Sequence, residues 1–216
     1  MARAHFRAEI FPNAARMERL DDAEDKRLMA ALADGNDHAL DQIIRRWQQP
    51  LRAFIQRSTG DEADTDDLLQ ETFVRVYKHR ARYRPAGRFS TWLFTIAVNL
   101  CRNHADKRRR RPTVSLDAMH ETSRGAVPAS ALSRQPSTDP IPSEQTLAGE
   151  RAEAVRAAIG ELPDDLRTAI LLFEYENLSH AEIATIVNTT PKGVETRLYR
   201  ARQHLREKLS RWLQQK

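Results

Sequence analysis

Apolar residues recur along this chain at the three- and four-residue spacing of a single helix face. In the first half these faces run through residues 40–55, 64–77 and 90–100. In the second half they run through residues 163–176 and 180–209. Strict alternation of apolar and polar residues, which would mark half-buried strands, is not sustained anywhere. The pattern predicts an all-α protein.

Local signals place the helix ends in the first half. Asp64 and Ser90 are of the residue types that cap helix N-termini, so each is expected to begin a helix. The Pro-Ala-Gly run at 85–87 separates those two helices. Pro50 either begins a second helix or kinks the first one.

The second half carries the signals of a helix-turn-helix. Ser179 and Glu182 form a capping-box pattern, residues 188–190 suit a tight turn, and Pro191 fits the first position of a final helix. Such helix pairs also occur as plain packing units. The basic character of the second helix favours DNA binding instead.

Residues 112–148 differ in composition from both flanks. Five of the ten prolines lie there, together with many Ser and Thr residues and no aromatic residue. Such a stretch buries too little apolar surface to offset the entropy of ordering, so we expect a flexible linker. It divides the chain into small helical domains at 24–111 and 149–213, with an N-terminal arm of unassigned role at 1–23.

Composition excludes several classes of protein. The chain has 216 residues and one Cys, so an internal disulfide framework is excluded and a Cys-rich zinc site lacks ligands. No apolar stretch approaches the ~20 residues that span a bilayer, and charge interrupts the first twenty residues. We therefore expect a cytoplasmic protein without membrane insertion, in which Cys101 and His104 are packing and surface residues.

The net charge of +5 hides an uneven distribution. Residues 61–71 hold six acids and no base, residues 74–111 hold twelve Lys or Arg and one acid (12 − 1 = +11), and residues 191–216 hold eight bases and two acids (8 − 2 = +6). Separate acidic and basic blocks indicate one surface for a basic partner and two for a polyanion.

In the first basic block, aromatic residues alternate with arginines. Cations that follow a backbone and rings that stack on bases are typical of single-stranded nucleic-acid binding. The loop at 82–89 carries most of them, and the basic end at 107–111 is expected to contact phosphate. The candidates drawn from the residues are Arg82, Tyr83, Arg84, Arg88, Phe89, Arg102 and Arg108. Some of the rings are also expected in the core.

The final helix is a candidate recognition helix for duplex DNA. Near its N-terminus it can present residues to base edges in a major groove, although a solvated amphipathic helix would carry similar charges. Glu195 can accept a hydrogen bond from a cytosine amino group. The candidates are Lys192, Glu195, Thr196, Arg197, Tyr199 and Arg200.

The acidic block permits two interpretations. Asp64, Asp66, Asp67 and Glu71 could hold a divalent metal, but their spacing does not bring all the carboxylates onto one helix face, and no base or nucleophile accompanies them. Docking on a basic helix of a partner fits better. We therefore expect no catalytic residues, no metal and no cofactor.

Several motifs resemble those of bacterial sigma factors. Residues 66–73 (DDLLQETF), 89–93 (FSTWL) and 96–99 (IAVN) resemble sigma region two. Residues 161–163 (ELP), 178–184 (LSHAEIA) and 194–202 (VETRLYRAR) resemble region four. Two such domains joined only by a linker are similar to the extracytoplasmic-function (ECF) group of the sigma-70 family.

This resemblance implies a role for each charged block. The acidic motif would dock on the β′ clamp helices of core RNA polymerase, with further contacts to the β subunit, through Asp66, Asp67, Leu68, Gln70, Glu71 and Phe73. The 82–89 loop, with Asn99 and Arg102, would open and read the −10 element of promoter DNA, and the final helix would read the −35 element. An anti-sigma factor is a further expected partner, and the protein would join the nucleoid when bound to polymerase.

Two other classes remain open. A stand-alone two-domain helix-turn-helix regulator would need neither the acidic motif nor the aromatic-basic block, and a metal-dependent nuclease would need the acidic cluster to bind metal. The sequence also departs from the family, in which many members carry a basic residue at Glu195 and Ser at Thr196.

Overall fold

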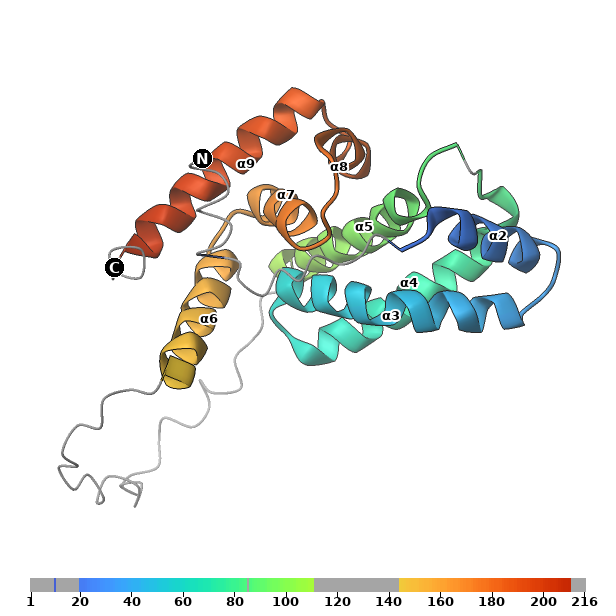
Figure 1. Ribbon diagram of the computed structural model, residues 1–216, viewed down its shortest axis with the longest axis horizontal. Helices are drawn as coiled ribbons and strands as arrows, with labels where there is room; N and C mark the ends of the chain where they lie inside the picture. Colours follow the sequence, from blue (N-terminus) through green and yellow to red (C-terminus); the bar gives the residue numbers. More distant parts are fainter. Residues whose placement is uncertain (1–9, 11–19, 85, 111–143, 211–216) are drawn as a thin grey trace, which may run out of the picture.

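The computed structural model describes residue 10 and residues 20–84, 86–110 and 144–210, with side chains from residue 149 onward in the last range. Throughout these ranges the regular structure is helical, as the sequence predicts (Figure 1). The helices form a first domain, α2 to α5, and a second domain, α6 to α9. The expected arm at 1–23 and linker at 112–148 lie mostly outside the described residues.

Within the described residues, the first domain contains four α-helices and a short 3₁₀ turn. Their bounds are α2 Asp22–Ala33, α3 His38–Thr59, α4 Glu62–His79, η1 Arg80–Arg82 and α5 Phe89–Arg110. Phe54, Phe89 and Phe94 are almost fully buried, and Trp47 meets the last two edge to face. These rings fill the space between α3 and α5.

A buried carboxylate anchors α2 to α3. Asp25 is 1% exposed and accepts hydrogen bonds from Trp47 Nε1 at 3.1 Å and Arg46 Nε at 2.9 Å. Burial raises the pKa of Asp25, and these two donors oppose that shift. The pairing compensates the charge that α2 brings into the core.

Two helix starts differ from the sequence prediction. Asp61, not Asp64, caps α4, and its carboxylate accepts from the backbone of Ala63 at 2.9 Å. Helix α5 begins at Phe89, one residue before the predicted cap Ser90. The Phe89 N–H instead donates to Asp22 at 2.7 Å, so a tertiary contact supplies the partner that a local cap would have given.

Pro50 lies inside one continuous helix, α3. A proline there removes a hydrogen bond, yet Trp47, Leu51 and Phe54 on the same face are buried and hold the helix against the core. The helix ends at Gly60, whose φ of 73° is the left-handed conformation that glycine adopts without strain.

The second domain contains α6 Glu144–Gly160, α7 Asp164–Glu174, α8 His180–Val187 and α9 Pro191–Lys208. Helix α6 begins within the stretch predicted to be linker, so the start of the folded unit lies before residue 149. Helices α7 and α9 pack on α8, and α6 packs on α9. The core comes from the predicted apolar positions, among them Ile183, Ile186, Val194, Leu198, Ala201 and Leu205.

The two domains lie against each other. Helix α8 packs on α5, and α6 and α7 pack on α3 (Figure 1). Thus the first helix of the helix-turn-helix rests on the helix that follows the basic loop.

Candidate polymerase and nucleic-acid interfaces

The predicted docking residues of α4 divide into an exposed row and a buried one. Asp66, Asp67 and Gln70 are exposed, whereas Leu68 and Phe73 are each only 8% exposed. The two buried side chains hold α4 on the domain core. The polar row is therefore the part of the motif that faces outward.

Basic neighbours partly neutralise this row. Asp66 pairs with Arg52 of α3, and Glu71 accepts from Arg75 Nε at 2.8 Å. The hydrogen bond from Arg75 lowers the pKa of Glu71. The Glu71 carboxylate therefore stays charged and can meet a basic partner.

Beside the acidic row lies an apolar groove between α3 and α4, with a volume of about 660 Å³. Leu40 and Ile44 of α3 line one wall, and Phe73, Val74 and Tyr77 of α4 line the other. The edge carries charged and polar residues, including Asp41, Gln70 and Lys78. Sequence reasoning found α4 but missed the wall from α3, because those residues fit the core pattern equally well.

The residues predicted to bind single-stranded DNA are arginines and aromatic residues, and their side chains differ in exposure. Arg82 and Arg84 are exposed, and Arg88 is half-buried. Tyr83 is half-buried, and its ring meets Trp92 edge to face with 4.9 Å between centroids. Burial, together with the charges of Asp22 and Asp25, raises the pKa of Tyr83 to about 12, so it stays a neutral phenol.

Phe89 does not occupy the position that a base-stacking ring needs. It is fully buried between Trp47, Tyr83 and Trp92, and no face of its ring is open to a nucleotide. The first turn of α5 points this residue into the core. The structure therefore gives Phe89 a supporting role under the loop, rather than the direct contact that the sequence predicted.

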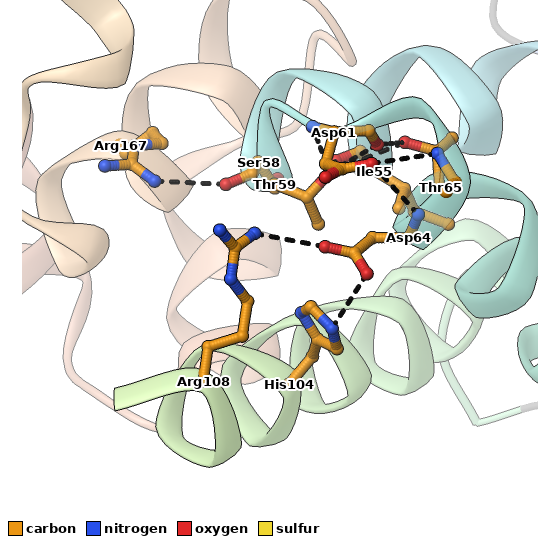
Figure 2. A network of polar contacts seen from close by, with 10 residues as sticks. Ile55, Ser58, Thr59, Asp61, Asp64, Thr65, His104, Arg108 and Arg167 are labelled. Carbon is orange, nitrogen blue, oxygen red and sulfur yellow. Dashed lines mark hydrogen bonds and ion pairs between the residues drawn. The ribbon is translucent and has the colours of Figure 1, made fainter. Parts of the chain in front are cut away.

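Along α5 the predicted residues follow the outer face. Asn99 and Arg102 are exposed. Arg108 donates to Asp64 at 3.1 Å, and His104 lies 3.1 Å from the other carboxylate oxygen, so Asp64 ties the start of α4 to the end of α5 (Figure 2). Asp64 and His104 thus have structural partners. Arg108 is exposed but engaged.

Cys101 is a packing residue, as the sequence predicted. It lies on α5 among apolar neighbours, and burial raises the pKa of its thiol to about 12.

The helix-turn-helix has well-defined ends. Ser179 and Glu182 form the predicted capping box, and Pro191 is the first residue of α9. Asn188 closes α8 in the left-handed conformation with a φ of 53°. Thr190 accepts from the Gly193 N–H at 3.0 Å. These local contacts fix the angle at which α9 leaves the turn.

Sequence reasoning missed the role of Gly193. A Cβ at this position would lie 2.7 Å from the Thr189 hydroxyl oxygen, closer than a Cβ atom approaches a non-bonded atom. A glycine near the start of a helix is an ambiguous signal, since it also weakens helices. Here it allows the turn to sit close against α9.

The outward face of α9 carries most of the predicted duplex readers. Lys192, Thr196, Tyr199 and Arg200 are exposed, and Glu195 accepts from Lys192 at 2.9 Å. A groove of about 430 Å³ runs along this face, with His180 of α8 on its edge. The exposed residues could reach base edges if α9 entered a major groove.

Two arginines of α9 pair with acidic residues of α7. Arg197 is half-buried and lies 3.5 Å from Asp165 of α7, so it does not share the outward face predicted for it. Arg202 bonds Glu174 at 2.9 Å, and that carboxylate is 1% exposed. Both arginines connect α9 to α7.

The described ranges hold neither a membrane-spanning helix nor a cluster of metal ligands. Every helix there is too short or too polar to cross a lipid bilayer. Nowhere in those ranges do three or more His, Cys, Asp or Glu side chains gather as a metal site would require.

Comparison with known proteins agrees with this arrangement. The family Sigma-70 region 2 matches residues 43–111, and Sigma-70, region 4 matches residues 152–205. RNA polymerase sigma-H factor of Pseudomonas aeruginosa is 33% identical over 83% of this chain and 91% of its own length. ECF RNA polymerase sigma-E factor of Haemophilus influenzae is 31% identical over 86% of this chain and 95% of its own.

A solved structure shares the arrangement of the helices. CnrH in complex with the cytosolic domain of CnrY is 26% identical, covers 87% of this chain and 97% of its own, and gives a TM-score of 0.62. The chain therefore belongs to the ECF group of the sigma-70 family of RNA polymerase sigma factors.

Proposed function

We propose that this chain binds core RNA polymerase, directs it to specific promoters and helps to open the −10 element, with no catalytic activity of its own. The observation that carries the proposal is the combination, in one chain, of an acid-edged apolar groove and a helix-turn-helix. A stand-alone regulator would need only the second of these.

The groove between α3 and α4 is the proposed polymerase-docking site. Its apolar walls would bury side chains of a partner helix, while Asp66, Asp67 and Glu71 would face basic residues on that helix. This chemistry fits the β′ clamp helices expected for the family. Leu68 and Phe73 would then act by holding α4 in place, and Phe73 would also contribute to the wall.

Arginines of the loop and of α5 form the proposed −10 surface. Arg82, Arg84, Arg88 and Arg102 would follow the displaced strand, and Asn99 can hydrogen-bond to a base. Phe89 supports the loop from beneath. On the second domain, Lys192, Thr196, Tyr199 and Arg200 would read the −35 duplex.

An anti-sigma factor is the third proposed partner. The related CnrH structure contains the cytosolic domain of CnrY. A protein of this function would work in the cytoplasm, at the nucleoid when polymerase carries it there.

Transcription from fragmented genomic DNA tests the proposal. Purified protein plus bacterial core RNA polymerase should give transcripts that are absent with core alone and whose start sites share −10 and −35 elements. Tight binding to specific duplexes without any transcript would favour the stand-alone regulator.

A charge reversal tests the docking site. Asp67→Arg should weaken binding to core polymerase at least tenfold, because it places a cation where a basic partner helix would lie. Glu153→Arg, on the exposed face of α6, makes the same charge change and should leave binding near the wild-type value. Equal affinities of the two variants would remove α4 from the docking surface.

A further inference from the structure

An acidic side chain lies on the otherwise basic face of α9 that the proposed function turns toward duplex DNA. Among the described residues that line the groove along this face, Glu195 is the single acid, whereas Lys192, Arg202 and Arg206 are basic. Phosphates repel a carboxylate, so Glu195 weakens rather than strengthens contact with the DNA backbone. A favourable contact of Glu195 with DNA would therefore have to be with the edge of a base.

Glu195 is held by a lysine three residues earlier in the helix. Lys192 Nζ lies 2.9 Å from Glu195 Oε2, and the two side chains are 82% and 43% exposed. Both residues belong to the first two turns of α9, and in a helix-turn-helix the residues near the start of the second helix contact base edges. The Thr196 hydroxyl donates to the Lys192 carbonyl at 3.0 Å and is thereby tied to the helix. The pair presents a cationic donor and an anionic acceptor side by side.

A donor beside an acceptor is complementary to one kind of base-pair edge. In the major groove, guanine offers the acceptors N7 and O6, and the cytosine paired with it offers the amino group on N4. A lysine ammonium has three donor hydrogens and a carboxylate has about four acceptor positions, so each can keep its partner and also bond a base. Lys192 would then face the guanine, and Glu195 would face the cytosine.

The other base pairs are less complementary to this pair of side chains. An A·T pair places its amino donor, N6 of adenine, between two acceptors, N7 of adenine and O4 of thymine. A carboxylate that accepts from N6 is repelled by both of these neighbours. A reversed G·C pair places the guanine acceptors against Glu195 and offers it no donor. Selection would therefore come from repulsion of the wrong bases as well as from attraction to the right one.

We propose that Lys192 and Glu195 together read one G·C base pair of the −35 element, and that Glu195 is the residue that selects cytosine. The placement of α9 in a major groove rests on the proposed function, and the identity of the base selected at this position goes beyond it. Arg202 is engaged elsewhere, because it bonds Glu174 of α7 at 2.9 Å.

Glu195→Gln tests this assignment, because it changes the hydrogen-bonding chemistry with little change in size. Glutamine can accept from N6 of adenine and donate to N7, so the base preferred at this position should change from cytosine to adenine. Glu207→Gln, at an exposed position of the same helix that does not line the groove, removes the same charge. Any general gain in DNA affinity from the loss of negative charge is thereby matched.

Base preference is measured on the full chain in two arms. With core polymerase, the protein selects from promoters obtained in the transcription assay whose −35 elements have been randomised. Without polymerase, it selects at low salt from random duplexes. Sequencing of the bound DNA should show one position at which the parent and Glu207→Gln favour cytosine. Glu195→Gln should lower the ratio of cytosine to adenine at that position by about fivefold or more and leave the other positions unchanged.

Several results would overturn the assignment. Identical preferences in Glu195→Gln and the parent, or an equal loss of preference at every position, would mean that Glu195 only supports the helix. A parent that prefers adenine at the affected position would assign the carboxylate to N6 of adenine instead. Absence of any sequence preference in both arms would leave α9 without a base contact.

Failure of the proposed function gives a different result. In that case the chain alone would select specific duplexes, while the holoenzyme would give no transcripts. The base read by Glu195 would still be measured in the arm without polymerase, so the two failures are distinguishable.

Discussion

In the first domain the proposed DNA-contacting arginines surround a core of buried rings, whereas in the second domain the proposed readers lie on one face of a single capped helix. The loop at 80–88 depends on Tyr83, Phe89 and Trp92 packing beneath it. Helix α9 depends on its own turn contacts and on two pairs to α7. The proposed surface for an opened strand is thus set by long-range packing, whereas the proposed duplex surface is set by contacts within the turn together with two ion pairs to α7.

The sharpest test of this contrast is Phe89→Ala. Removing a fully buried ring should lower the free energy of unfolding by about 3–5 kcal/mol. Urea unfolding followed by tryptophan fluorescence measures this, since Trp47 and Trp92 lie in the first domain. Arg84→Ala, at an exposed position, should leave stability within about 0.5 kcal/mol and weaken DNA binding. A stable Phe89→Ala protein that fails only in DNA binding would restore the base-stacking role.

In the second domain, the variant Glu174→Ala tests whether the contact with α7 anchors α9. It leaves the largely buried guanidinium of Arg202 without this carboxylate, and the cost should be about 3 kcal/mol. Amide hydrogen exchange over α7 to α9 in the full chain measures it. Lys192→Ala breaks an exposed pair of similar length and should cost less than about 1 kcal/mol. Equal exchange in both variants would contradict the anchoring of α9 by α7.

The contribution of each α9 arginine to DNA binding should depend on the direction in which its side chain points. Arg200→Ala should weaken binding to the −35 duplex by about 1–3 kcal/mol if the contact is bidentate to a base. Arg197→Ala should change base preference less, because Arg197 faces Asp165. Fluorescence anisotropy on promoters recovered from the transcription assay would compare the two. An unchanged preference in Arg200→Ala would remove that residue from the reader set.

The smallest effect is expected for Tyr83→Phe. The Tyr83 hydroxyl is buried and has no hydrogen-bond partner in the described part of the chain. Its removal should leave stability unchanged or raise it by up to about 1 kcal/mol. A loss larger than that, measured by urea unfolding, would indicate that the loop relies on this hydroxyl as well as on the ring.

The features that the sequence predicted correctly are those that depend on residues close together in the chain. The helical class, the capping box at Ser179 and the Pro191 start of α9 all follow from residues within four positions of one another, and the structure confirms them. Membership in the ECF group was also visible in the motifs. The exposed positions of Lys192, Tyr199 and Arg200 followed from the apolar face of α9.

Prediction was poorer where partners come from distant parts of the chain. The start of α5 was misplaced because Asp22, 67 positions away, supplies the hydrogen bond to Phe89. Phe89 was assigned to DNA because periodicity does not say which rings face the core. The outward direction expected of Arg197 was wrong for the same reason, since its acidic partner Asp165 lies on α7.

The buried thiol on α5 has a consequence for signalling. With a pKa of about 12, Cys101 presents almost no thiolate at neutral pH, and thiolate is the form that peroxide oxidises. Cys101 is also the single cysteine in the sequence. An oxidative stress signal would therefore have to be sensed by another molecule and reach this protein through binding.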